Sequence, residues 1–344
     1  MMSGNVFLMV AGAKLVAWDF RAHRQFELSA EYARRLVNLV YGKASVDADS
    51  AIDKDLIRSG VVSLPYDCDV AWGWDVLSKI FHFGTKNIPV SNLPDTKEEW
   101  AKQYIAHCEE AWEKTLPIEN TTLYEEVGFQ LPVGGRNDNF HQLLKRRSTC
   151  RAFMNQPIHL QEVSQVLSDA LGFVPERELS IDCGLPDTLR KRRSSPSGGG
   201  VNATEGYLYA RSVVGLASGL YYYDPNRHQL HLISSELPEL GSLLAGQHFA
   251  NDLPVGVFLT SRLDKLWWKY EHSRTYRMAL VEVGHVAQTL QLSATALGLS
   301  TWLTGALTEK NLDPYLRLQI PGEEALFFVG WGHSDGLPIP KVLR

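Results

Sequence analysis

The chain has 344 residues, a formal net charge of -5 at pH 7 and 44% hydrophobic residues. These values are typical of one large domain, or of a large and a small one, and they imply neither a nucleic-acid-binding nor a membrane-binding surface. The first apolar run, NVFLMVAGA, has no basic segment before it and is followed by Lys14, so we expect no secretory signal and no membrane span. We therefore expect a cytoplasmic protein.

The sequence shows no pattern of metal ligands. The eleven histidines include no His-x-x-x-His pair, and the four cysteines are widely spaced. We expect no bound metal and reduced thiols, as in a cytoplasm. The cysteines are Cys68, Cys108, Cys150 and Cys183.

The first 66 residues predict a small α/β domain. Two short apolar runs in residues 6–20 are typical of strands, Ser29 is a suitable N-cap for a helix, and residues 50–58 predict a second helix. The run VVSL (61–64) then predicts another strand. This order resembles the small winged-helix-like peptide-recognition elements of peptide-modifying enzymes. A segment that simply packs on the main domain explains it about as well.

Residues 67–139 predict a helical connecting region. A helix over residues 75–83 would bury Leu77, Ile80 and Phe81, and a second helix is expected over residues 97–114. The run LPVGGRNDN (131–139) is typical of a loop, so we expect the main domain to span residues 140–344.

Two motifs in the main domain suit a phosphorylated, flat ligand. In RRSTCRAF (146–153), guanidinium groups can bind phosphate oxygens through paired charged hydrogen bonds, and hydroxyl groups can complete the shell. In SPSGGG (195–200), glycines allow the backbone to approach a flat ligand, although such a run can also be a flexible linker. The strand-like run VNATEGYLYARS follows at once and argues against a linker. The polar stretch between the motifs has a basic end, residues 190–193. This end could attract an acidic peptide, or it could simply belong to a solvated loop.

The C-terminal half alternates strand signals with one long helix. GLYYYD and HQLHLI predict a strand pair, VGVFLTS a buried strand, and EALFFVGWG a last strand. The helix that runs to Gly298 is apolar on nearly every face, which predicts burial, and Gly298 is suited to end it. A polar cluster precedes this helix: Lys269, Tyr270, Arg274, Tyr276 and Arg277.

Taken together and in this order, these motifs resemble the SagB-type dehydrogenases. These are FMN enzymes of the nitroreductase superfamily, and they oxidise azolines to azoles in ribosomally made peptides. The match covers the chain from Arg146 to the C-terminus and includes PSGG, Glu205, the Lys-Tyr pair and an Arg-x-Tyr-Arg segment. Asn202 and Ala203 replace the family's usual His or Tyr and Pro.

The resemblance implies an α+β, nitroreductase-like three-layer sandwich, in which helices flank a mixed sheet, and a homodimer with two FMN sites at the subunit interface. It implies a precursor peptide as substrate and a cyclodehydratase as a possible partner. Lys269 and Tyr270 would be the catalytic, proton-handling pair, with Lys269 buried near Arg274 and Arg277. The residues placed at FMN are Arg147, Ser148, Thr149, Arg151, Pro196, Ser197, Gly198, Gly199, Gln288, Thr304, Gly305 and Lys341.

Two other functions remain compatible with the sequence. One is a different FMN reductase that uses NAD(P)H to reduce dehydroamino acids or small electrophiles. The other is a peptide-binding scaffold without flavin.

Overall fold

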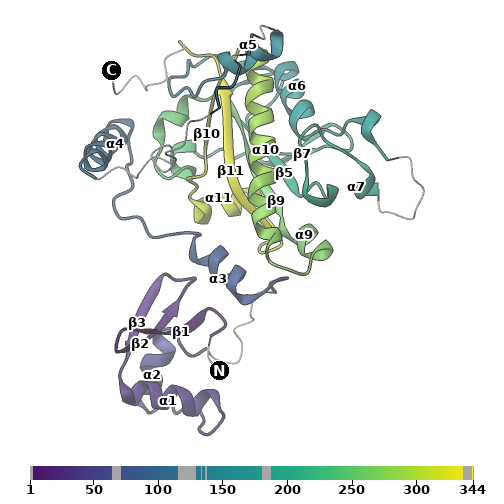
Figure 1. Cartoon of the computed structure of the whole chain (residues 1–344). Coiled ribbons are helices and arrows are strands. Elements are labelled where there is room, and N and C mark those ends of the chain that lie inside the picture. Colours follow the sequence, from purple (N-terminus) through teal and green to yellow (C-terminus); the bar gives the residue numbers. More distant parts are fainter. Residues whose placement is uncertain are drawn as a thin grey trace. The chain divides into compact units, whose positions relative to one another are not determined.

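The computed structural model describes residues 3–63, 71–114, 129–132, 134–135, 138–179, 187–335 and residue 343 (Figure 1). The chain divides into two compact units. The first unit comprises Met1–Ser91, Leu263–Arg277 and Ile320–Gly322, and the second comprises Asn92–Arg262, Met278–Gln319 and Glu323–Arg344. The domain boundaries expected from the sequence stay a prediction.

The first unit begins with a three-stranded antiparallel sheet and two helices. The elements are β1 (Val6–Ala11), β2 (Lys14–Asp19), β3 (Arg24–Leu28), α1 (Ala30–Val40) and α2 (Ala51–Arg58). Gly12, with φ +61°, makes the tight β1–β2 turn. Ser29 occupies the predicted N-cap position of α1 without a side-chain hydrogen bond, whereas the Ser50 side chain accepts from the Asp53 N–H at the start of α2. Its core, which includes Ala17, Leu36 and Leu56, comes from residues 6–62.

The polar run RQFEL forms β3, which is mostly exposed and is held by its pairing with β2. One strand prediction in this region is wrong. The run VVSL forms no strand over its described residues 61–63, where only Val62 makes an isolated bridge. Leu64 lies outside the described residues.

Helix α3 (Val76–Gly84) buries a different face from the predicted one. Leu77 and Phe81 are 74% and 54% exposed, whereas His82 and Phe83 are buried. His82 Nδ1 lies 2.9 Å from the hydroxyl of Tyr276, so a polar contact orients the helix where apolar spacing alone predicted otherwise.

The second unit is built on a six-stranded sheet of order β10-β11-β9-β5-β7-β8. These strands pair antiparallel, and an isolated parallel bridge from Thr149 to Thr301 of β10 makes the pairing mixed. β9 is buried at every residue except its last, as VGVFLTS predicted. The strands are β5 (Thr204–Ala210), β7 (Gly219–Asp224), β8 (Gln229–Ser234), β9 (Val255–Arg262), β10 (Ser300–Thr304) and β11 (Glu323–Gly332).

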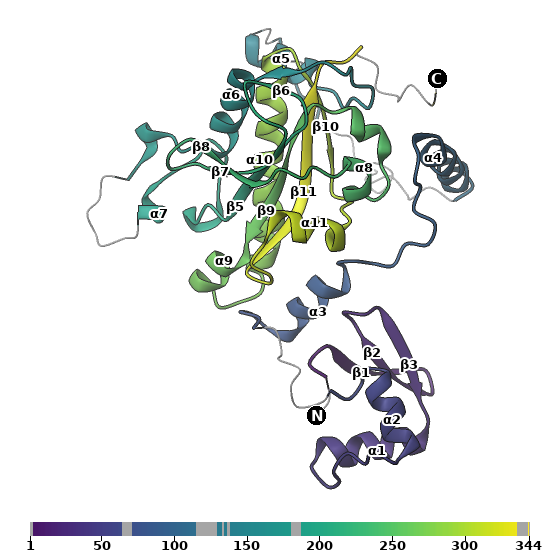
Figure 2. The ribbon, with the colours of Figure 1, turned by 180° about the vertical axis from the view of Figure 1, so that it is seen from behind.

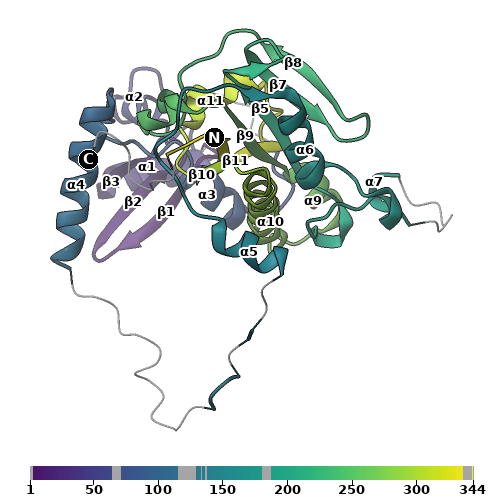
Figure 3. The same cartoon turned by 90° about the horizontal axis from the view of Figure 1, so that it is seen from above.

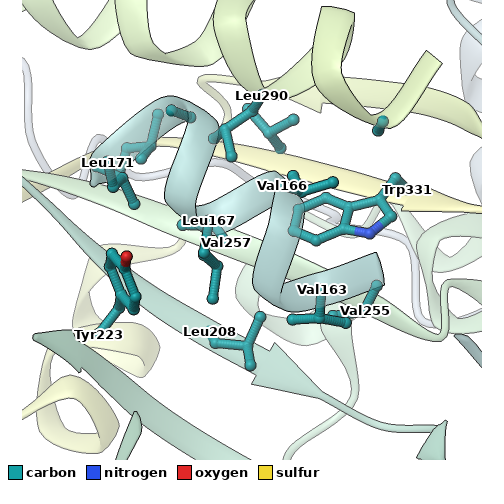
Figure 4. Close-up of a cluster of buried hydrophobic side chains, with 14 of the residues drawn as sticks. Val163, Val166, Leu167, Leu171, Leu208, Tyr223, Val255, Val257, Leu290 and Trp331 are labelled. Atoms are coloured by element: carbon teal, nitrogen blue, oxygen red, sulfur yellow. The ribbon is translucent and has the colours of Figure 1, made fainter. Parts of the chain in front are cut away.

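Helices cover both faces of this sheet, which gives three layers. Helices α6 (Leu160–Leu171) and α10 (Thr275–Ala296) pack on one face around Leu167, Val257, Leu290 and Trp331 (Figures 3 and 4). Shorter helices pack on the other face (Figure 2). Each fully buried large side chain contributes about 1.5–3 kcal/mol relative to an exposed one, so two such cores fix the sheet. The predicted α+β three-layer fold is therefore confirmed.

The remaining elements of this unit are short, apart from α4. On the second face lie α8 (Leu240–Leu243), the 3₁₀ turn His248–Asp252 and α11 (Glu309–Leu316). Trp100 of α4 packs on Phe249 with ring centroids 4.8 Å apart. The others are α4 (Lys97–Trp112), α5 (Asn139–Arg146), α7 (Asp187–Arg190) and the short parallel pair β4 (Ile158–His159) and β6 (Val213–Val214). Helix α9 (Leu263–Lys269) belongs to the first unit.

Helix α10 is buried on one side only, so the prediction of burial on nearly every face is wrong for the single chain. Met278, Leu280 and Val281 are 41%, 45% and 46% exposed. The helix ends as predicted: Gly298 has φ +80°, and the Leu299 N–H donates back to Ala294 O at 3.0 Å. The unexpected feature is the exposure of these three apolar side chains near the start of the helix.

Candidate functional site

The segment 147–154 is held in place by strand-like backbone pairing. The N–H of Cys150 donates to Thr301 O at 2.8 Å, and the N–H of Met154 donates to His333 O at 2.8 Å. Cys150, Ala152 and Phe153 are buried, which fixes the backbone that carries the basic side chains. The motif therefore lies along β10.

Arg147 and Arg151 are half-buried, and among the described residues their charges have no partner. Neither guanidinium makes a hydrogen bond or ion pair with any residue that the structure describes. Thr149 is half-buried between them in sequence, and Ser148 is exposed. Two cations on a fixed segment beside hydroxyl groups are suited to bind a phosphate.

The SPSGGG loop is fixed onto α10 by a buried glutamate. Glu282 is 3% exposed, and its carboxylate accepts hydrogen bonds from the Ser197 hydroxyl at 2.6 Å and from the Thr204 N–H at 3.0 Å. Ser197 Oγ in turn accepts from the Asn202 N–H at 2.8 Å. The hydroxyl of Ser197 is thus committed to holding the loop on α10.

Two further contacts run along the next turns of α10. A ring nitrogen of His285 lies 3.2 Å from Pro196 O, and Ser195 Oγ lies 2.7 Å from Thr289 Oγ1. Gly199 has φ +63°, a conformation that residues with a side chain rarely adopt. The loop is therefore an ordered element, and the linker interpretation is wrong.

Helix α10 connects the two motifs. Gln288 is exposed and accepts a hydrogen bond from Gln291 Nε2 at 3.3 Å, while Gln291 Oε1 accepts from Thr301 Oγ1 at 3.5 Å. Thr301 is the residue that bridges Thr149. Residues 282 and 291 lie about 13 Å apart along the helix, so the glycine loop and the basic segment lie on two ends of one support.

Thr304 and Gly305 lie at the far end of β10. Thr304 Oγ1 accepts from Gln247 Nε2 at 3.1 Å and from the Ala306 N–H at 3.0 Å, so this hydroxyl stabilises the turn after the strand. Gly305 is exposed, and a Cβ there would lie 3.3 Å from the Phe327 ring. Lys341 lies outside the described residues.

Lys269 and Tyr270 belong to the first unit, at the end of α9. Lys269 is exposed, with its Nζ 5.7 Å from the Tyr270 ring centroid, so its expected burial is wrong. The turn itself is firmly held. Trp74 Nε1 donates to Tyr270 O at 2.8 Å, and a Cβ on Gly73 would lie 2.2 Å from the Trp267 ring. No sequence pattern indicates this contact with residues 72–74.

Glu282 is the residue that sequence reasoning missed most clearly. We expect Glu282→Ala to lower the free energy of unfolding by about 2–4 kcal/mol, because it leaves the Ser197 hydroxyl and the Thr204 N–H buried without an acceptor. Chemical denaturation measures this. His285→Ala is the matched control one turn further along, since His285 is exposed and makes one contact with the same loop. Equal losses in both variants would contradict a special role for Glu282.

Two other searches concern the described residues alone. No group of three or more His, Cys, Asp and Glu side chains there could hold a metal ion. No helix in that part of the chain has the length and apolar character needed to cross a membrane. Cys108 and Cys150 are free thiols, and Cys68 and Cys183 lie outside the described ranges.

The fold and these fixed motifs define an α+β protein in which a basic segment lies beside β10 and a glycine loop is held on α10. The family model described as "Nitroreductase family" matches residues 144–333, which is more than half of the chain. The chain therefore belongs to the nitroreductase family, a family of FMN-dependent oxidoreductases.

Three individual proteins are similar to this chain. MJ1384 of Methanocaldococcus jannaschii, named as a nitroreductase, is 33% identical over 181 residues, which are 52% of this chain and 83% of that protein. The trifolitoxin-processing protein TfxB of Rhizobium leguminosarum bv. trifolii is 28% identical over 133 residues, which are 37% of this chain and only 36% of TfxB. A chain in the E. coli microcin synthetase McbBCD complex with truncated pro-MccB17 has a TM-score of 0.50 and 21% identity, over 75% of this chain and 92% of that chain.

Proposed function

We propose that this protein is an FMN-dependent, SagB-type dehydrogenase that oxidises azolines to azoles in a ribosomally made peptide. The observation that carries the proposal is the joint placement, in a nitroreductase domain, of two motifs. Arg147 and Arg151, which pair with no described residue, lie beside β10, and the fixed glycine loop lies on α10. The likeness to a trifolitoxin-processing protein and to a chain of a microcin synthetase supports a peptide as the substrate.

The chain's own groups suit FMN at both ends of this support. Arg147 and Arg151, with the hydroxyls of Ser148 and Thr149, would hold the phosphate. The backbone of residues 196–199 would lie against the flat ring system, because glycine permits close approach. We also assign Gln288, Thr304, Gly305 and Lys341 to the cofactor. Bound FMN supplies the hydride acceptor.

The oxidation also releases a proton, which a group of the protein must accept. We assign this step to Lys269, and the orientation of the proton path to Tyr270. The contact of Trp74 with Tyr270 O fixes the backbone of the pair. Trp74 is thus a positioning residue.

The exposed apolar side chains at the start of α10 support a homodimer. Met278, Leu280 and Val281 are 41%, 45% and 46% exposed, and exposed apolar side chains of this kind suit a protein interface. We propose that a second copy of the chain covers them.

We assign peptide binding to the first 64 residues. β1 and β3 are the edges of the three-stranded sheet, and Val10 of β1 is 74% exposed, which suits the addition of a peptide strand. A cyclodehydratase that forms azolines would supply the substrate.

Removal of residues 1–64 should separate binding from chemistry. The deleted segment contains its own core and spares Trp72 and Trp74, so we expect FMN retention, an almost unchanged kcat and a raised KM for the peptide. Trp74→Phe removes the hydrogen bond to Tyr270 O and keeps an aromatic side chain at this position. This variant should lower kcat instead. An insoluble or flavin-free truncation would show that these residues complete the fold rather than bind peptide.

The test of the function is turnover of an azoline-containing peptide by the purified protein, followed by mass spectrometry. Loss of two hydrogen atoms per ring is expected. Efficient NAD(P)H oxidation without any peptide would identify a different reductase. A colourless protein that binds peptide would identify a scaffold.

A further inference from the structure

A second basic site lies beside the glycine loop, distinct from the Arg147 segment. It is a pocket of about 320 Å³ in the second unit, and its wall includes Pro196 and Ser197 of the loop. Three guanidinium groups line it, from Arg177, Arg192 and Arg193, together with polar side chains such as Ser194 and Asn202. The chain as a whole carries a net charge of -5, so this convergence of cations runs against the general charge.

Each of these arginines is anchored through Nη1 to backbone carbonyls rather than to a carboxylate. Arg177 donates to Arg193 O at 3.5 Å, Arg192 to Leu189 O at 2.5 Å and to Lys191 O at 2.9 Å, and Arg193 to Thr204 O at 2.5 Å. A carbonyl orients a guanidinium and leaves its charge in place. Each guanidinium has five N–H donors, so several remain for a ligand.

No carboxylate in the described part of the chain pairs with any of the three within 4.0 Å. The carboxylates whose charges act on Arg193 are Glu205 and Glu282, and Glu282 already accepts from Ser197 and Thr204. The pocket therefore retains an excess of positive charge, which a low-dielectric wall focuses toward an anion.

Arg193 is the buried member of the group. It is 5% exposed, its guanidinium carbon lies 5.3 Å from the Phe173 ring centroid, and its Nε has no partner among the described residues. Burial lowers the pKa of Arg193, and the charges of Glu205 and Glu282 raise it. A buried donor without an acceptor costs stability, and an anion in the pocket would relieve this cost.

We propose that this pocket binds an oxyanion, a carboxylate or a phosphate, carried by the molecule that reacts beside the glycine loop. Planar guanidinium forks bind both groups through paired hydrogen bonds. Two sources supply this chemistry: an acidic side chain of a peptide, and the phosphates of a nucleotide reductant. The site would add specificity beyond the proposed oxidation, and anion binding can be measured without any turnover.

The test is calorimetric titration of the FMN-loaded protein with inorganic pyrophosphate at low ionic strength. We expect saturable binding that weakens with added salt, and an affinity lowered about 10-fold or more in each of Arg192→Gln and Arg177→Gln. Arg177 is exposed, so its variant should fold even if that of Arg192 is destabilised. Arg227→Gln is the matched control, since Arg227 is 71% exposed, pairs with Asp224 and lies outside the pocket lining.

Competition then identifies the source of the anion. Displacement of pyrophosphate by an acetylated tetraglutamate peptide points to an acidic substrate, and displacement by NADPH points to a nucleotide. The proposal is overturned if the protein binds no pyrophosphate, if both variants bind it as tightly as the control, or if pyrophosphate releases FMN in equal amount. These outcomes do not depend on azoline oxidation, so this site and the proposed function can fail separately.

Discussion

Lys269→Ala and Tyr270→Phe are each expected to slow azole formation by about 100-fold or more, as for the loss of general base catalysis. The physical reason is that FMN accepts a hydride but leaves a proton on the ring, and these side chains are the groups assigned to it. Peptide mass spectrometry under single-turnover conditions measures the rate.

The control for this prediction is Lys265→Ala, one turn earlier on the same helix α9. All three variants should remain yellow and keep the same oligomeric state. Full turnover by folded, flavin-loaded Lys269→Ala and Tyr270→Phe would remove the pair from the mechanism, and Lys269 would then be only a surface residue.

Arg147→Ala and Arg151→Ala are expected to weaken FMN binding by the value of a charged hydrogen bond, about 1.5–3 kcal/mol each. Both side chains are half-buried on a backbone fixed by the Thr149–Thr301 bridge and have no counter-charge in the described chain. Flavin content after dialysis, and titration of the apoprotein with FMN, measure the effect.

Arg146→Ala is the matched control, because Arg146 is the exposed last residue of α5 and directly precedes Arg147, but is not among the residues assigned to FMN. Its loss should leave flavin content unchanged. If Arg147→Ala and Arg151→Ala retain FMN as well as this control does, the phosphate lies elsewhere, and the pocket of Arg177 and Arg192 becomes the site to test.

The layers of the fold could be predicted because apolar spacing reports burial directly. VGVFLTS is buried at every residue as β9, and GLYYYD and HQLHLI pair as β7 and β8. The end of α10 at Gly298 followed from the conformational freedom of glycine. The nitroreductase family came from motif order, and the family match over residues 144–333 confirms it.

Predictions that depended on which face of a helix is buried were less successful. α3 turns His82 inward because Tyr276 provides a polar partner from a distant part of the sequence, and hydrophobic spacing contains no record of such a partner. α10 looked buried on every side because its exposed face is also apolar, as in Leu280 and Val281. A chain that associates with a second copy would show this same pattern.

The sequence predicted which residues belong to the candidate site, but not the hydrogen bonds that connect them. Glu282 looked like a polar interruption in an apolar helix, yet its carboxylate holds Ser197 and the start of β5. Lys269 was expected to be buried and is exposed, because α9 buries Leu263 and Leu266 and turns its last residue to solvent. The anchoring of Arg192 and Arg193 through backbone carbonyls depends on loop geometry that no local pattern contains.

The most direct test of the central claim is anaerobic mixing of the purified, FMN-loaded protein with an azoline-containing peptide while flavin absorbance is followed. The account predicts loss of the oxidised-flavin band together with formation of one azole per flavin reduced. The account is contradicted if the flavin band and the azoline peptide both stay unchanged while NAD(P)H readily reduces the flavin of the same protein.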